Sequence, residues 1–319
     1  MTISNNKLLV GAAGAGGGGG PTIDQIFSVW SHDATSSETD IPTGIDLATE
    51  GGMIMGFRRN AAPSNPWIFD TERGINKVIY TNLTYQQLDY TSSGINAFNT
   101  NGHQMYGSQT TFNNGSSNTG YMYWTWRKTK NFFDIQTYTG NGSARAISHD
   151  LGCGVGMIWI KRLDSDQGWA VYHRGADGSA PEDKYLILNT TAAVADSANW
   201  WNDTAPTSSV FTVGTDHAVN ADGGTYVAYI FAHNNSDGNF GLTGDQDVIK
   251  CGSYTGTGSR QVINLGFRPQ YIIIKRTDAT SDWTVFNDYS GLTAWDDAGP
   301  RFRYLNSATT EASSGTTQV

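Results

Sequence analysis

The chain has 319 residues, of which only 15% are charged, and its formal net charge is −9. Average soluble domains carry about 25% charged residues, so this surface is expected to be rich in Ser, Thr, Asn and Gly, as in extracellular and virion β-proteins. The 20 lysines and arginines are spread thinly, which argues against a nucleic-acid groove. No run of roughly eighteen apolar residues is present, so no membrane-spanning helix is expected.

Residues 1–22 predict a flexible or anchoring tail. Residues 11–20 consist of seven glycines and three alanines, which cannot bury enough surface to fold alone. This stretch is either a linker or an extended tail that packs against a partner. The apolar segment before it is too short for a signal peptide and is a candidate anchor to a partner, pairing as an added strand. The candidate anchor comprises Lys7, Leu8, Leu9 and Val10.

Three blocks of the sequence share one order of features: an apolar run, a basic pair, a polar turn, a tryptophan, a second apolar run and a glycine. They cover Met53–Gly74, Met157–Gly175 and Tyr271–Gly291. The period of roughly one hundred residues is the size of a small domain. The sequence therefore predicts three related units in tandem.

The repeated blocks are short, rich in β-branched and aromatic residues, and bounded by turn formers, as strands are. No window of the sequence shows convincing helical periodicity. We therefore predict an all-β chain of tandem β-sandwich or jelly-roll repeats after the Gly-rich tail. The predicted repeats are residues 23–132, 133–247 and 248–319, and the third is incomplete.

The first two repeats end in matching apolar blocks, Gly120–Thr129 and Thr225–Asn234. The third repeat has no counterpart of this closing block. Two explanations stay open at this stage. Either the third repeat borrows a closing strand from another chain, or the sequence is a piece of a longer one.

Two groups of tryptophans have different expected roles. Trp67, Trp169 and Trp283 recur at one place in the repeat, which favours a packed core position. Trp200 and Trp201 lie side by side in a polar insertion that the first repeat lacks. They either pack locally or form an exposed contact for a glycan or a protein partner, and they are the candidate contact residues.

Acidic pairs precede two of the recurring tryptophans: Asp164 with Asp166, and Asp278 with Asp282. Glycosidases need two carboxylates, which makes these pairs candidates for catalysis. Aspartate is also favoured in turns because its side chain accepts hydrogen bonds from nearby backbone, and we favour this interpretation.

A metal or cofactor site receives little support from the sequence. The hairpin residues Asp216, Asn220 and Asp222 offer oxygen ligands of the kind calcium prefers, but without the spacing of an EF-hand loop. No paired histidine spacing, GxSxG elbow or P-loop is present. We therefore predict no catalytic residues, no cofactor and no metal.

Basic pairs follow each apolar run, and we expect one member of each to form a salt bridge or to protect a sheet edge. A grip on an anionic sugar is the alternative. The pairs are Arg58 with Arg59, Lys161 with Arg162, and Lys275 with Arg276. The two cysteines, Cys153 and Cys251, fall at different places in their repeats and predict two buried free thiols.

The order of motifs resembles a repeat domain found in structural proteins of tailed bacteriophages, notably marine cyanophages. The resemblance covers nearly the whole chain and carries no catalytic residue. It implies concanavalin-like sandwiches in a tail fibre or other virion protein. The motifs that carry it are Lys7–Ala15, Thr22–Trp30, Gly44–Leu47, Phe69–Gly74, Gly156–Arg162, Lys184–Asn189 and Ser209–Phe231.

The expected function is therefore that of a non-enzymatic virion structural protein, a tail or head fibre or a fibre adaptor. Its N-terminal segment would bind other virion proteins, and its repeats would contact host-surface glycan or a further fibre protein. Fibres of this class are usually homotrimers. The alternatives are a polysaccharide depolymerase of the tail, dependent on Asp278 or Asp282, and a passive capsid decoration protein.

Overall fold

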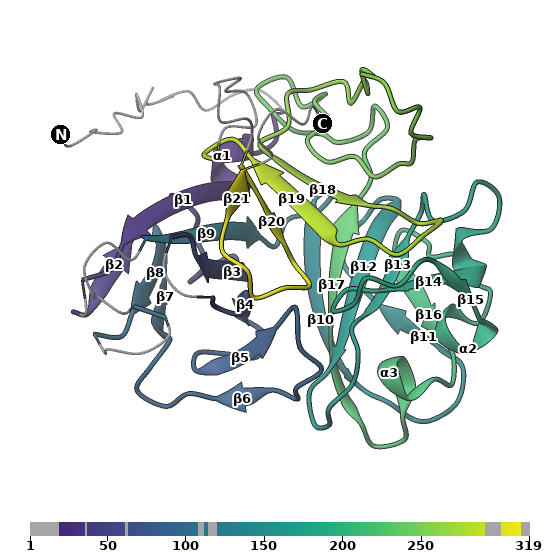
Figure 1. The fold of residues 1–319 in the computed structure, drawn as a ribbon, viewed down its shortest axis with the longest axis horizontal. Coiled ribbons are helices and arrows are strands. Elements are labelled where there is room, and N and C mark those ends of the chain that lie inside the picture. Colours follow the sequence, from purple (N-terminus) through teal and green to yellow (C-terminus); the bar gives the residue numbers. More distant parts are fainter. Residues whose placement is uncertain are drawn as a thin grey trace.

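The structure is a computed structural model that describes residues 19–35, 37–60, 63–107, 112–113, 120–290 and 301–313. These residues are nearly all in strands, turns and loops, which confirms the predicted all-β class (Figure 1). The strands form antiparallel sheets. The four helices of the described residues are single turns: α1 (Ile23–Ile26), η1 (Pro181–Asp183), α2 (Ala198–Trp201) and α3 (His217–Asn220).

The first repeat is a sandwich of a six-stranded sheet and a smaller three-stranded sheet. The large sheet has the spatial order β1 (Phe27–Asp33), β9 (Gly120–Arg127), β3 (Gly52–Arg58), β4 (Trp67–Asp70), β5 (Lys77–Tyr80) and β6 (Leu88–Asp89). The small sheet has the order β2 (Thr39–Ile41), β8 (Gly102–Met105) and β7 (Ile95–Asn99).

The second repeat copies this plan with a two-stranded small sheet. Its large sheet has the order β10 (Phe133–Thr139), β17 (Thr225–Ala232), β12 (Val155–Arg162), β13 (Ala170–His173), β14 (Lys184–Ile187) and β15 (Ala195–Asp196). The small sheet pairs β11 (Arg145–Ser148) with β16 (Val210–Val213). In both large sheets the closing strand, β9 or β17, lies between the first strand and the strand with the basic pair.

The third repeat has four described strands in one sheet. They follow the order β18 (Tyr271–Lys275), β19 (Trp283–Asn287), β20 (Arg301–Tyr304) and β21 (Ala312–Ser313). This order matches β3 to β6 of the first repeat and β12 to β15 of the second. Among the described residues, the third repeat has no counterpart of the closing strand and no second sheet.

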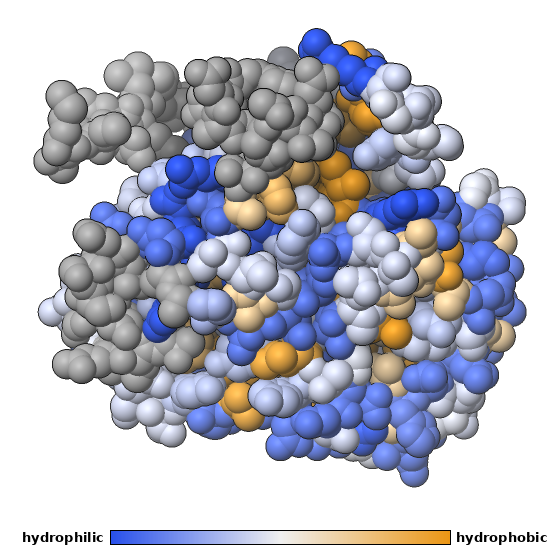
Figure 2. Space-filling view, in the orientation of Figure 1, coloured by the Kyte–Doolittle hydropathy of each residue, from blue (hydrophilic) through white to orange (hydrophobic). Residues whose placement is uncertain are grey.

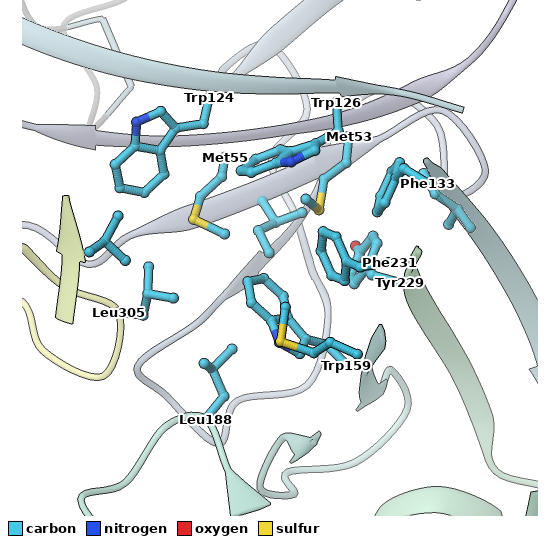
Figure 3. Close-up of a cluster of buried hydrophobic side chains, with 14 of the residues drawn as sticks. Met53, Met55, Trp124, Trp126, Phe133, Trp159, Leu188, Tyr229, Phe231 and Leu305 are labelled. Carbon is cyan, nitrogen blue, oxygen red and sulfur yellow. The ribbon is translucent and has the colours of Figure 1, made fainter. Parts of the chain in front are cut away.

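One hydrophobic core is shared by all three repeats. Alternate residues of a strand face opposite sides of its sheet, so Met53 and Met55 of β3 enter the shared core while Ile54 faces the first repeat's own small sheet. Figure 3 shows side chains of the first repeat meeting Trp159 of the second and Leu305 of the third. The two six-stranded sheets and the four-stranded sheet of the third repeat each give one apolar face to this core, so the three repeats are packed into a single body.

Each of the first two repeats also has an outer core between its two sheets. Ile54 and Trp67 lie in the outer cluster of the first repeat, and Ile158 and Ile160 in that of the second. Cys153 lies in the second outer cluster and Cys251 packs against the shared core. Both are free thiols, as predicted, but Cys251 is half-buried rather than buried.

Backbone hydrogen bonds join the repeats in a cycle. The amide of Gln167 donates to the carbonyl of Thr84 at 2.8 Å, which ties the second repeat to the first. The amide of Ser281 donates to Thr191 at 2.9 Å, which ties the third repeat to the second. The amide of Ser64 donates to Ala308, also at 2.9 Å, and so ties the first repeat back to the third. The tandem units therefore form a closed ring.

The three recurring tryptophans are all buried, which confirms their predicted core role. They are not equivalent, however. Trp67 pairs with Gly56, and the residues at this register in the other repeats are Ala170, opposite Ile160, and Thr284, opposite Ile274. Trp67 is thus offset by one residue from Trp169 and Trp283.

A one-residue offset turns a strand side chain to the other face of its sheet. Trp169 and Trp283 accordingly lie in the shared core, and Trp67 lies in the outer cluster of the first repeat. Pro66 occupies the place that tryptophan has in the other repeats, because its carbonyl accepts from Thr81 as that of Trp169 does from Leu188.

Candidate functional site

The side of β18 that faces away from β19 is unpaired within the described residues, and we call it the open edge. The corresponding sides of β3 and β12 are covered by β9 and β17. Asp288 donates its amide to the carbonyl of Gln270 at 2.9 Å. Since hydrogen-bonded pairs alternate along an antiparallel ladder, the backbone groups of Tyr271, Ile273 and Lys275 point to the open edge. Such an edge is a template for another strand.

Burial distinguishes β18 from its two counterparts. Every residue of β3 and β12 is buried except the last arginine of each strand, whereas all five residues of β18 are only half-buried. Ile272 and Ile274 occupy the places of Ile158 and Ile160, whose side chains are fully buried beneath a second sheet. The open edge therefore continues into an apolar face that no described strand covers.

A neighbouring segment of the third repeat is also without a partner strand. Residues 254–266 repeat the sequence of residues 138–152 and keep two of its left-handed glycines, because Gly258 and Gly266 have φ of 72° and 83°. The equivalent residues of the second repeat belong to β10 and β11, which pair with β17 and β16. Residues 254–266 form no strand.

Apolar side chains of this segment are exposed as a result. Ile263 is 48% exposed, while its counterpart Ile147 in β11 is 8% exposed. Val262 and Tyr254 are 86% and 52% exposed. Figure 2 shows apolar atoms among the loops at the top of the molecule, over the end of the third repeat. We define the candidate site as the open edge of β18 together with residues 254–264.

Lysine or arginine side chains donate to backbone carbonyls at the junctions between repeats, a role that the sequence did not reveal. The ammonium of Lys161 donates to the carbonyls of Thr84, Arg162 and Gln167 at 3.1, 3.0 and 2.9 Å. Burial lowers the pKa of Lys161 to about 8. Thr84 belongs to the preceding repeat, so this side chain fastens the second repeat to the first.

Lys275 repeats this arrangement one repeat later, donating to the carbonyls of Thr191 at 3.0 Å and Ser281 at 2.5 Å. Burial lowers the pKa of Lys275 too, in this case against the opposing effect of the Asp282 charge. The inner members of two basic pairs are therefore structural and do not project toward a ligand.

The third junction replaces the lysine with an arginine from the other side. Phe57 holds the place of Lys161 and Lys275, and the guanidinium of Arg303 lies over its ring at 4.3 Å. Arg303 donates to the carbonyls of Ser64 and Thr309, both at 2.7 Å. Burial lowers the pKa of Arg303 to about 9. A cation that donates to backbone carbonyls thus completes each of the three junctions, and it is buried in the case of Lys161 and Arg303 and half-buried in the case of Lys275.

The outer members of the pairs form the salt bridges that the sequence predicted. Arg162 binds Asp164 through two nitrogens, both at 3.0 Å. Arg276 binds Asp278 in the same way, and its charge and hydrogen bonds lower the pKa of that carboxyl. In the first repeat Arg59 bridges to Glu311 at 3.3 Å.

The four candidate acids lie in the loops that follow β12 and β18, and each has a hydrogen-bond partner. Asp164 accepts from the amide of Thr225, and Asp166 accepts from the amide of Gln86 at 2.8 Å. Asp282 accepts from the side chain of Asn306 at 2.7 Å. The pKa values of Asp164 and Asp278 are lowered, whereas the general acid of a glycosidase must retain its proton. The arrangement supports a structural role for these residues, although these partners of Asp164, Asp166 and Asp282 are distant in the chain and not in the same turn.

The hairpin residues considered for calcium also have structural roles. Asp216 caps α3 by accepting from the amide of Ala218, and Asn220 is fully buried and donates to Gly214 and Ser143 carbonyls at 2.7 Å. Across the residues that the structure describes, no three His, Cys, Asp or Glu side chains gather to hold a metal ion.

The candidate contact residues Trp200 and Trp201 are 7% and 2% exposed, so their interpretation as an exposed contact was wrong and local packing is correct. Ser197 caps the helical turn α2, and this turn rotates consecutive side chains so that both indoles reach the outer core of the second repeat. Trp200 stacks on Tyr185 at 3.9 Å between ring centroids, and Trp201 meets Tyr172 edge to face at 5.9 Å. The candidate anchor, Lys7, Leu8, Leu9 and Val10, lies outside the described residues.

A polar cleft of about 300 Å³ lies where the first repeat meets the second. Two of its lining charges are paired with each other, because Lys128 lies 3.7 Å from Asp134, and Lys128 also binds Glu72 at 2.6 Å. Asp134 also accepts from the amide of Asp150 at 2.9 Å.

A family model, described as a domain of unknown function (DUF7483), matches residues 32–314. The chain belongs to the DUF7483 family. The match runs through all three repeats, so the family unit of this DUF7483 protein coincides with the closed ring rather than with one sandwich. No curated protein and no solved structure matches the chain. No helix within the described part of this DUF7483 protein is long and apolar enough to cross a membrane.

Proposed function

We propose that this DUF7483 protein is a structural component of a bacteriophage virion, a tail or head fibre or an adaptor for one. The proposal includes no catalytic step. The observation that carries it is the closed ring, in which Ser64 of the first repeat bonds to Ala308 of the third around a shared core. A closed ring of this kind holds its loops in fixed positions, as is required of a structural protein that contacts a partner through its loops. The resemblance of its motifs to phage fibre repeats supports the same role.

The N-terminal segment is proposed to anchor the chain to other virion proteins, and the ring to face a host-surface glycan or a further fibre protein. A homo-oligomer, with a trimer favoured, follows from the class of protein. These assignments are tested on assembled particles. Phage carrying the chain with residues 1–20 deleted should lack the protein in purified virions, while the deleted chain keeps the circular dichroism and melting temperature of the full chain.

Normal incorporation of the shortened chain would contradict the anchor. Failure of an antibody against the ring to label any position on purified particles would contradict the virion role itself. Binding of the purified chain to host cells separates attachment from passive decoration, because a decoration protein leaves such cells unlabelled.

A further inference from the structure

We propose that the open edge of β18 binds an extended apolar strand of the kind that closes the first two repeats. The inference does not depend on the virion role. In the first two repeats the same edge is covered by β9 and β17, antiparallel strands of eight residues. Seven of the eight residues are buried in each of these strands. These two strands define the chemistry of the occupant.

The strand that binds the open edge must pair along both of its own edges, as β17 does. β17 pairs with β12 on one side and with β10 on the other. In the third repeat, β18 corresponds to β12, and the chain leading into Tyr254 corresponds to β10. A strand of the β17 kind would therefore pair with β18 and draw the exposed Tyr254 beneath it, as Tyr138 of β10 packs on Tyr226 at 5.0 Å.

The exposed Val262 and Ile263 specify a second part of the partner. Their counterparts Ala146 and Ile147 lie in β11 and pair with β16, where Ile147 faces Phe211. In the second repeat β16 precedes β17 by a short connection that contains α3. A single partner segment with a short apolar strand, a turn and an eight-residue apolar strand would cover both exposed features.

A second copy of this chain does not meet the requirement. Its β9 and β17 are each paired on both sides within their own sheets, and its own open strand, β18, has only five residues, so among the described residues it offers no free eight-residue strand. The geometry of strand addition supplies affinity through backbone bonds and selectivity through alternate side chains. The partner is thus recognised by aromatic and aliphatic residues on both faces of an extended strand.

The probe is a labelled synthetic peptide with the sequence of residues 207–232 of this chain, carrying two added terminal lysines for solubility. It is titrated against the full chain by fluorescence anisotropy, and hydrogen exchange is measured with and without it. We expect saturable binding and at least tenfold slower exchange at residues 254–264 and 271–275. A scrambled peptide and one with prolines in place of Val227 and Tyr229 should not bind.

Two variants of the full chain locate the binding site. Ile263→Lys changes an exposed side chain, and Ile273→Pro removes an amide that points to the open edge and leaves the β19 ladder intact. Each should weaken binding at least tenfold. The matched control is Leu242→Lys, an 81% exposed residue elsewhere, which should bind as the native chain does.

The proposal is overturned if the native chain shows no saturable binding, or if both variants bind as tightly as the control. Binding that appears only after deletion of residues 1–18 would identify this chain's own N-terminal segment as the occupant and also overturn it. Protection of residues 271–275 that rises with protein concentration in the absence of peptide would identify a second copy, with the same consequence.

Discussion

The indole nitrogen of Trp169 donates a hydrogen bond of 2.9 Å to the backbone carbonyl of Tyr80, which lies in the preceding repeat. Trp283 makes the same bond to Ile187, one repeat later, at 3.1 Å. The indole nitrogen of Trp67 has no partner among the described residues, because its one-residue offset turns it into the outer core. The recurring tryptophan is thus a fastener between repeats at two positions and a packing residue at the third.

Replacing Trp169 with Phe should lower the free energy of unfolding more than the same change at Trp67. Both substitutions remove similar buried volume, but only the first removes a hydrogen bond to the Tyr80 carbonyl, which then keeps only the 3.5 Å bond from the Leu83 amide, and this loss costs about 1 kcal/mol. Urea unfolding of the two variants measures the difference. Equal losses in the two variants would show that the hydrogen bond contributes nothing.

The junction between the third and first repeats should tolerate an exchange of its cation. Arg303→Met leaves the carbonyls of Ser64 and Thr309 unpaired and should cost on the order of 3 kcal/mol in unfolding free energy. Phe57→Lys in the native background should destabilise the protein, because it buries a second charge beside Arg303.

In the Arg303→Met background, Phe57→Lys should instead recover part of the loss, about 1 kcal/mol or more. The new ammonium at position 57 would donate to the carbonyls of its own junction that are equivalent to those bound by Lys161 in the second repeat. Denaturant unfolding of the four proteins forms a double-mutant cycle. Additive losses would contradict the equivalence of the three junctions.

Pro66 explains an unpaired atom nearby. The side-chain oxygens of Asn189 and Asn306 accept from the amides of Trp169 and Trp283 at 2.8 and 2.9 Å. The corresponding oxygen of Asn82 is buried without a partner, since proline has no amide hydrogen.

Pro66→Ala should therefore create a new bond to Asn82. Asn82→Ala is expected to cost about 1 kcal/mol more in the Pro66→Ala background than in the native one. The comparison of the two losses cancels the separate effect of proline on the unfolded chain. Identical losses would show that the new amide does not reach the oxygen.

Acid should destabilise the fold well before its carboxylates titrate. The ring of His103 is fully buried against Tyr123, neither nitrogen has a partner among the described residues, and burial lowers its pKa to about 3. Burial also lowers the pKa of His173, to about 4. Unfolded histidine has a pKa near 6.5, so the unfolded chain takes up these protons first as the pH falls.

The contribution of His103 to stability is therefore complete above about pH 6.5 and declines toward pH 3, by about 1.4 kcal/mol per pH unit. His103→Phe should flatten the fall in unfolding free energy between pH 6.5 and 4. Trp67→Phe, a change in the same outer core, serves as the control and should keep the native slope. An unchanged slope in His103→Phe would contradict the prediction.

Local patterns were sufficient for much of the fold. The short β-branched and aromatic run in Met157–Arg162 predicted a strand, and the aspartates after it lie in the loop that follows, although their backbone donors Gln86 and Thr225 are distant in the chain. The register of Trp67 was not predictable, because the longer turn before it shifts the strand by one residue without changing its apolar character. Trp200 and Trp201 were misassigned because a four-residue helical turn has too short a period to recognise in sequence.

The candidate site depended on information that no single repeat contains. Lys161 bonds to Thr84, 77 residues away in the chain, and nothing around a basic pair distinguishes a buried lysine from an exposed one. The missing closing block was visible in the sequence, but not its consequence. Only the structure shows that Ile263 is exposed and that one side of β18 is unpaired, so that a strand of known chemistry would cover both.

The bond from Ser64 to Ala308 also dictates when the molecule can be finished during synthesis. Linear repeat arrays fold outward from any stable pair of neighbours and fray from their ends. Here the contact that the first repeat needs is synthesised more than two hundred residues later. Until then one side of the first repeat stays uncovered. Once the bond between Ser64 and Ala308 forms, no repeat is terminal, so unfolding has no end of the array at which to begin.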